Sequence, residues 1–204
     1  YIFLLLFLYY LKTRRFRNLV VCFSCLLCLG IYHTVMRWYD RPCPSLVFYN
    51  VRGCPAIHCI AEDGTSWLNY ADTLSDKRRL QAVAANYWRR HQLLPPIEVT
   101  ADCQNVDFCR HQQIVFYHGC RICMVTDNRW RNKSAASPLF INYMYLCKGY
   151  NGRLEELTGL FSPSCILLDA SLSDDRKQFF REECKRLHLH FITLSEEGSV
   201  RFLL

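Results

Sequence analysis

The densest group of side chains that could bind a charged polymer is the run at residues 129–133. Arg129, Arg131 and Lys133 place three cations around Trp130. Such cations neutralise phosphates, and an indole ring can stack on a base of single-stranded DNA. The run therefore predicts a contact with single-stranded DNA. The alternative is a solvated loop with a partly buried tryptophan.

A second group has the residue types that bind metals. Cys120 and Cys123 form a C-x-x-C pair, and Cys109 and His118 lie close to them in the sequence. Cysteine and histidine at such spacing suit tetrahedral zinc. However, zinc fingers usually draw on a second, distant pair, and residues three apart in a strand face opposite sides of a sheet. We therefore expect buried thiols at these positions, with no metal and no other cofactor.

Two further candidates carry less chemistry. His188 and His190 form an H-x-H pair, but no D-H follows them, and a histidine at a helix C-terminus is stabilised without any ligand. Asp169 and Ser171 could suggest a nucleophile, but no G-x-S-x-G elbow surrounds the serine. We expect neither a metal site nor a hydrolytic triad at these residues.

The segments that must position these side chains form an α/β (α+β) pattern with mixed sheets. Runs of β-branched and aromatic residues predict strands, and helical spacing after Ser75 and Ser173 predicts capped helices. The helix expected at 76–92 presents one face made of Leu80, Val83, Ala84, Tyr87 and His91. In chain order we expect strands at 45–51, 56–61 and 65–71, a helix at 76–92, strands at 97–101, 106–110, 113–118, 121–126 and 139–146, a helix at 153–160, a strand at 165–169, a helix at 174–187, and strands at 190–194 and 199–204.

The first 41 residues have a composition typical of membrane helices. Residues 1–11 are apolar, residues 12–17 are a basic turn, and residues 18–38 are largely apolar. About 20 apolar residues at 1.5 Å each span a hydrocarbon core of roughly 30 Å, so the second run predicts a transmembrane helix and the first the end of another. Because the basic turn favours the cytoplasmic side, the residues after it would emerge on the opposite face. The alternatives are a signal peptide and a buried helical hairpin.

This organisation divides the 204 residues into a transmembrane hairpin at 1–41, a linker at 42–44 and an exported domain at 45–204. The net charge of +7 comes partly from the basic turn. Of the 13 cysteines, three lie in the second apolar run and ten in the exported part, where disulfides can form but cannot be paired from sequence.

Residues 50–57 and 148–152, together with the order of elements, resemble the C-terminal end of ComEC-type competence proteins. These proteins are inner-membrane channels for DNA uptake, and many carry a C-terminal domain of metallo-β-lactamase fold. The family's D-V-G-Q-G-D-A segment matches Asn50-Val51-Arg52-Gly53-Cys54-Pro55-Ala56, and its K-x-x-H-H-G-S segment matches Lys148-Gly149-Tyr150-Asn151-Gly152. The family's last strand–helix–strand matches residues 165–204, with Gly198 as its turn glycine.

The chain departs from this family pattern at the metal ligands. Active hydrolases of the fold need an H-x-H-x-D-H segment, which the sequence lacks. Asn50 and Pro55 replace the acids of the opening segment, and both histidines of the later segment are missing. The resemblance therefore implies a degenerate, non-catalytic metallo-β-lactamase-like domain rather than an enzyme.

The resemblance further implies the C-terminal part of a multi-pass competence protein of the bacterial inner (plasma) membrane. Its domain would lie on the periplasmic or extracytoplasmic side and would scaffold or guide DNA during transformation. The expected partners are single-stranded DNA, the membrane, the remaining transmembrane part of the same protein, and other proteins of the uptake machinery. The alternatives are a metal-dependent hydrolase or nuclease with atypical ligands, and a membrane-anchored protein-interaction module.

Overall fold

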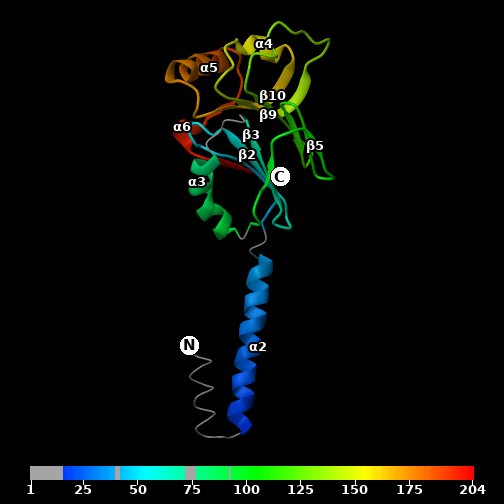
Figure 1. The fold of residues 1–204 in the computed structure, drawn as a ribbon, viewed down its shortest axis with the longest axis vertical. Coiled ribbons are helices and arrows are strands. Elements are labelled where there is room, and N and C mark those ends of the chain that lie inside the picture. Colours follow the sequence, from blue (N-terminus) through cyan, green and yellow to red (C-terminus); the bar gives the residue numbers. More distant parts are fainter. Residues whose placement is uncertain (1–15, 40–41, 72–76, 92) are drawn as a thin grey trace. The chain divides into compact units, whose positions relative to one another are not determined.

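The computed structural model describes residues 16–39, 42–71, 77–91 and 93–204. The chain forms two compact units, Tyr1–Arg41 and Pro42–Leu204. The described part of the first unit is one helix, α2 (Phe16–Tyr39), drawn in blue in Figure 1. Apolar side chains such as Phe23, Leu27 and Ile31 are more than half exposed on it.

The predicted membrane hairpin is not supported by the structure. The first predicted span, residues 1–11, and most of the basic turn at 12–17 lie outside the described residues. The second predicted span, residues 18–38, falls within α2. Across the described part of the chain, however, no helix combines the length and the apolar character that a membrane crossing requires.

The second unit contains two mixed sheets (Figure 1). The five-stranded sheet has the order β12-β1-β2-β3-β4, in which only β3 and β4 pair in parallel. The hairpin that joins β2 to β3 turns at residues 61–64, where the backbone N–H of Gly64 donates to the Ala61 carbonyl oxygen, and Asp63 accepts hydrogen bonds from Thr65. The strands are β1 (Ser45–Phe48), β2 (Ala56–Ile60), β3 (Ser66–Tyr70), β4 (Ile97–Val99) and β12 (Val200–Leu203).

The seven-stranded sheet has the order β11-β10-β9-β8-β7-β6-β5. Its strands from β8 to β11 pair in parallel, and the remaining pairs are antiparallel. His118 and Gly119 both adopt positive φ in the two-residue turn between β7 and β8, as the turns favoured in β-hairpins require. The strands are β5 (Cys103–Gln104), β6 (Phe108–His111), β7 (Ile114–Tyr117), β8 (Cys120–Val125), β9 (Leu139–Leu146), β10 (Phe161–Leu168) and β11 (Phe191–Thr193).

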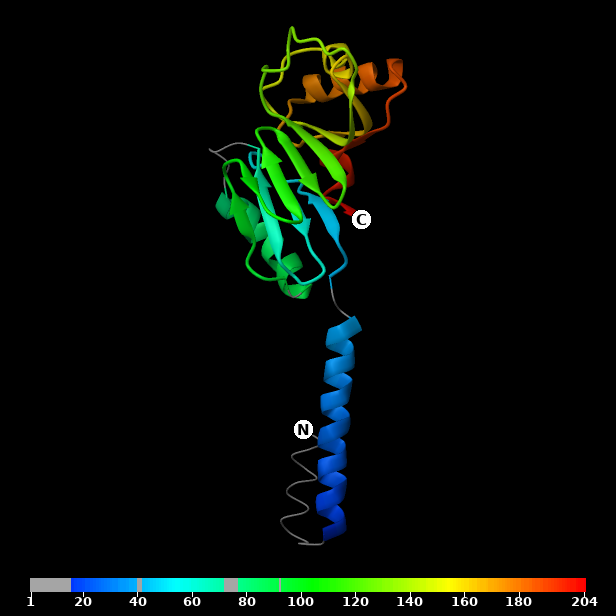
Figure 2. The same ribbon diagram turned by 90° about the vertical axis from the view of Figure 1, so that its right-hand side faces the viewer.

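The core of the second unit divides into three apolar clusters that define four layers. One cluster lies between the sheets and joins side chains such as Phe48 and Trp67 of one sheet to Tyr117 and Tyr145 of the other. A second packs the outer face of the five-stranded sheet against α3 (Lys77–Arg90). The third packs the outer face of the seven-stranded sheet against α4 (Leu154–Thr158) and α5 (Asp174–Arg186), and Figure 2 shows α5 over its sheet.

The predicted mixed α/β class is therefore confirmed, with local differences. Val83, expected on the buried face of α3, is 57% exposed, and Trp88 packs inward in its place. The β10 strand begins at Phe161 rather than at residue 165. The short strand β5 and the short helix α6 (Leu194–Glu197) carry no clear signal in the sequence.

Candidate functional site: a cavity at the strand ends

The loops that follow several strands meet at one edge of the two sheets and enclose a cavity of about 550 Å³. Because β8, β9 and β10 run in parallel, their carboxyl ends lie at the same edge, where ligands bind in open α/β sheets. The five-stranded sheet adds the loop after β1 and the end of β3. The cavity thus joins Gly53 and Pro55 to Lys148 and Gly149, which come from the two segments that carry the family resemblance.

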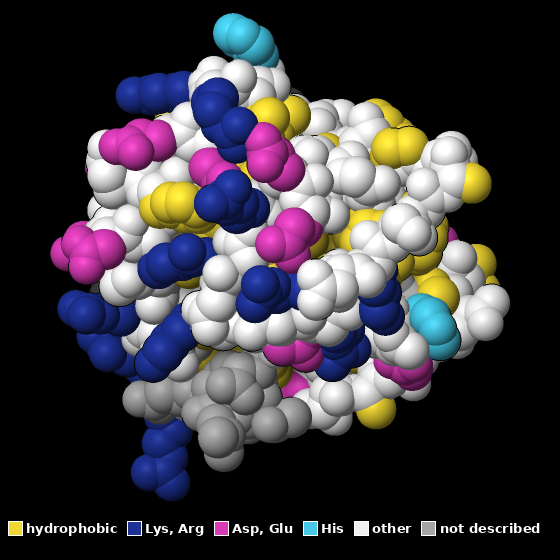
Figure 3. Space-filling view, turned by 90° about the horizontal axis from the view of Figure 1, so that it is seen from above, with side chains coloured by type: hydrophobic (Ala, Val, Ile, Leu, Met, Phe, Trp, Pro, Cys, Tyr) yellow, Lys and Arg dark blue, Asp and Glu magenta, His cyan; other side chains and the backbone are white. Residues whose placement is uncertain are grey.

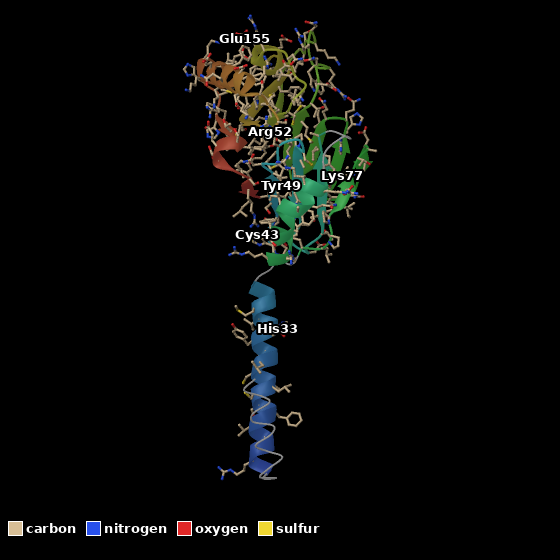
Figure 4. The ribbon with its side chains drawn as sticks, turned by 60° about the vertical axis from the view of Figure 1, so that its left-hand side comes forward. His33, Cys43, Tyr49, Arg52, Lys77 and Glu155 are labelled. Atoms are coloured by element: carbon tan, nitrogen blue, oxygen red, sulfur yellow. The ribbon has the colours of Figure 1, made fainter. Side chains whose placement is uncertain are left out.

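Lys148 supplies the cavity's cation. Its side chain is exposed, and within the described residues its ammonium group makes no ion pair or hydrogen bond. The backbone N–H of Lys148 donates to Ser171 Oγ at 3.1 Å, which fixes the loop after β9 against the loop after β10. Arg52, labelled in Figure 4 on the loop after β1, is also exposed and directly precedes the lining residue Gly53.

The Lys148 loop is held in place by backbone packing and by α5. Gly149 has a φ of 116°, and a Cβ atom at that position would lie 2.2 Å from the carbonyl oxygen of Thr126. Arg176 of α5 donates to the carbonyl oxygens of Tyr150 (3.2 Å) and Gly152 (3.0 Å). The guanidinium of Arg176 also lies over the ring of Phe180, 4.4 Å from its centroid. The lysine is therefore presented by a rigid loop.

Asp169 is a fully buried acid beside the cavity. Its carboxylate accepts a short hydrogen bond from the Tyr145 hydroxyl and one of 2.7 Å from the backbone N–H of Ser171. Burial raises the pKa of Asp169 above its ordinary value, although these hydrogen bonds oppose the shift. Both carboxylate oxygens are used within the protein, so Asp169 shapes the Ser171 loop.

Asp127 is the other charged residue that lines the cavity, and Arg129 neutralises it. Arg129 Nε lies 3.0 and 2.9 Å from the two carboxylate oxygens, and a terminal guanidinium nitrogen lies 2.8 Å from one of them. Burial alone would raise the pKa of Asp127, but the hydrogen bonds and charge of Arg129 hold it below its ordinary value. Lys148 is therefore the uncompensated charge of the described lining.

A second hollow of about 220 Å³ adjoins this cavity and shares Ala71 and Thr126 with it. Arg110 lines it and donates to the carbonyl oxygens of Val99 (2.8 Å) and Gln112 (3.2 Å). Burial lowers the pKa of Arg110. Lys148 therefore lines one of two neighbouring hollows and Arg110 the other.

Of the predicted DNA-binding residues, Arg129 lines the smaller hollow, and the side chains of this loop make contacts within the protein. Arg129 pairs with Asp127, and Arg131 lies 3.4 Å from a carboxylate oxygen of Glu156. The Trp130 indole donates to Gln113 (2.6 Å), packs edge-on against Phe161, and carries the Lys133 ammonium 5.5 Å from its centroid. Trp130 thus serves the fold, and DNA contact through this loop stays a prediction.

The four predicted metal-type residues do not converge on one site, although Cys109 and His118 line the same hollow. Cys120 packs toward the core between the sheets, whereas Cys123 is buried under the helices on the opposite face. Cys109 lies in β6 opposite Phe116, and His118 lies in the turn after β7. Within the described ranges, no three His, Cys, Asp or Glu side chains gather as metal ligands would, and Cys109, Cys120 and Cys123 form no disulfide.

The two histidines of the predicted H-x-H pair lie in different surroundings. His190 Nδ1 lies 3.2 Å from the Cys165 thiol, and His188 adopts a φ of 54° at the end of α5. Sequence reasoning did not find Thr126 or Arg176 as parts of the site. No local pattern marks them, because their roles arise from strands and helices that only the tertiary fold brings together.

Comparison with known proteins identifies the second unit. Residues 46–204 match the model of a family described as the ComEC C-terminal domain. No curated protein and no solved structure matches the chain.

Proposed function

The chain belongs to the ComEC family of competence proteins, and from this membership we propose that its second unit is a non-catalytic DNA-guiding domain. The family match links the chain to competence and DNA uptake. The proposal concerns what the domain does there. It would contact single-stranded DNA as a scaffold, without cutting it.

The observation that carries this proposal is the chemistry of the strand-end cavity. The family-related segments that border it contribute Lys148 and glycine backbone, while Asn50 and Pro55 stand where the family pattern has acids. A lysine ammonium attracts a phosphate directly through its charge, without a bound metal ion between them. Figure 3 shows further Lys and Arg side chains spread over one face, with Asp and Glu between them.

DNA binding by the full chain tests this proposal. We expect a labelled single-stranded oligonucleotide to bind with an affinity that falls as salt rises, because phosphate contacts release counterions. Charge reversal of Arg129, Arg131 and Lys133 tests the predicted loop, and Lys148→Glu tests the cavity.

The oligonucleotide should stay intact with magnesium, manganese or zinc present. Cleavage would favour the metal-dependent hydrolase, and absence of binding would favour the protein-interaction module.

We further propose that the domain lies on the extracytoplasmic face of the inner membrane, as part of a multi-pass protein. The basic residues at 12–17, next to the apolar sequence of 18–38, support this orientation. Protease added to spheroplasts should digest the domain and spare a cytoplasmic marker. A domain that is protected until the cells are lysed would contradict the orientation.

A further inference from the structure

We infer that the strand-end cavity binds a single phosphate group through the ammonium of Lys148 and the hydroxyl of Thr126. The inference rests on the proposed function, because it names the part of DNA that the cavity would recognise. The inference goes beyond the proposed function, because it assigns a pocket that free phosphate or a nucleotide can also enter.

The first argument is the charge of the lining. The two charged side chains of the described lining are Asp127 and Lys148. Arg129 forms a two-oxygen contact with Asp127, so this acid does not cancel the lysine. Within the described residues the Lys148 ammonium has no anionic partner, which leaves a positive charge facing a cavity of about 550 Å³.

The second argument is the direction of the hydroxyl protons. Ser171 Oγ accepts the backbone N–H of Lys148, and Thr126 Oγ1 accepts the side-chain amide of Gln113 at 2.6 Å. A hydroxyl that already accepts a hydrogen bond keeps its own proton to donate. The Ser171 hydroxyl uses its proton on the Asp169 carboxylate, so the donors left in the described lining are the Thr126 hydroxyl and the Lys148 ammonium, a pair that suits an oxyanion.

The third argument is preorganisation. Gly149 packs its backbone against Thr126 so closely that no side chain fits, and Arg176 holds the following carbonyls. The backbones of Lys148, Thr126 and Ser171 are thus fixed relative to one another, and the exposed Lys148 side chain extends from this fixed loop. The neighbouring acid Asp169 is occupied by Tyr145 and Ser171, so its oxygens do not enter the cavity as acceptors.

Calorimetric titration of the full chain tests this inference with three probes: inorganic phosphate, deoxyadenosine 5′-monophosphate and phosphate-free deoxyadenosine. We expect the first two to bind and the nucleoside not to bind. Lys148→Gln should weaken phosphate binding about tenfold, because a charge-assisted hydrogen bond is lost. Thr126→Val removes the other donor at similar side-chain volume and should weaken it about threefold to tenfold. Lys185→Gln removes an exposed charge on α5 away from the cavity lining and should bind as the unmodified chain does.

The outcomes separate this inference from the DNA proposal. Failure of phosphate to bind, or equal binding by Lys148→Gln and the unmodified chain, would overturn the phosphate site. If such a chain still bound DNA, the DNA-guiding role would stand without it. If phosphate bound through Lys148 but oligonucleotides did not, the phosphate site would stand and the DNA role would fail. Tighter binding of the nucleotide than of phosphate would identify a nucleotide as the preferred source.

Discussion

His58 shows how a single residue is adapted to the core beneath α3. Its side chain is fully buried, and its Nδ1 lies 2.8 Å from the Tyr49 hydroxyl. Because the Trp88 indole donates to the same hydroxyl at 2.9 Å, Tyr49 has its own proton to donate to Nδ1. The imidazole proton then sits on Nε2, which has no partner in the described structure. The site holds a neutral imidazole.

This neutrality makes stability depend on pH. Burial lowers the pKa of His58 from 6.5 to about 3. Below pH 6.5 the His58 imidazole is protonated in the unfolded chain but stays neutral in the folded chain. Folding stability that is present at neutral pH is therefore lost as the pH falls toward 3. Between pH 7 and pH 5 we expect a loss of about 2 kcal/mol in the free energy of unfolding, measured by urea denaturation.

The variant His58→Leu provides the control for this effect. Leucine cannot titrate, so the variant should lose most of the pH dependence in this window, although its stability at pH 7 will be lower. Burial also lowers the pKa of His91, which leaves a smaller dependence of the same sign. An unchanged slope in the variant would show that His58 is not its source.

At the scale of elements, the conformation of the loop after β9 is held by contacts with three other segments. The end of β8 contacts Gly149 through the Thr126 carbonyl, α5 binds the carbonyls of Tyr150 and Gly152 through Arg176, and the loop after β10 accepts the Lys148 N–H. The segment is short, and its Tyr150 ring is fully buried in the cluster under α4 and α5, where it stacks on Phe180 of α5. Its conformation is therefore imposed by these neighbours.

A pair of glycine substitutions measures that constraint. Gly149→Ala introduces a Cβ atom 2.2 Å from the Thr126 carbonyl oxygen at a φ of 116°. We expect it to destabilise the protein by about 2–4 kcal/mol, since it adds a backbone clash to an unfavourable φ. Gly53→Ala is the matched control, because Gly53 has a φ of 84° with open space around it. Its cost should be about 1 kcal/mol, from the unfavourable φ alone.

Equal unfolding free energies for the two variants would show that the contact between Gly149 and Thr126 does not constrain the loop. Phosphate titration of Gly149→Ala adds a second measurement, since a displaced loop would carry Lys148 with it.

The sequence predicts an element well where local residue preferences determine its structure, and less well where tertiary contacts with other elements do. Helix α3 lies where the spacing of apolar residues predicts a helix, but its buried face is turned toward Trp88, which donates to Tyr49 and packs in the same cluster. The sequence places the start of β10 too late, because Pro163 lies within the strand and proline usually interrupts one. It is tolerated because β11 pairs only with the stretch from Ile166 to Leu168, so β10 has one hydrogen-bonded neighbour around the proline.

At the scale of the whole molecule, the cavity is the feature that sequence reasoning could approach only in part. The resemblance singled out residues 50–57 and 148–152, and the fold places both at the cavity. Thr126 and Ser171 come from loops after different strands of the parallel part of the seven-stranded sheet. Their contribution arises from strand order, which no local spacing encodes.

The pairing of β1 with β12 has a consequence for folding kinetics. These strands lie at opposite ends of the domain sequence, and their neighbours Asn50 and Ser199, which share a hydrogen bond, are 149 positions apart. Contacts of such high sequence separation form slowly, because a long loop must close before they contribute stability. Until β12 docks, β1 presents an unpaired backbone edge, and the cluster between the sheets lacks Val200 and Phe202. This late-closing edge is where misfolding intermediates of the chain would associate with one another.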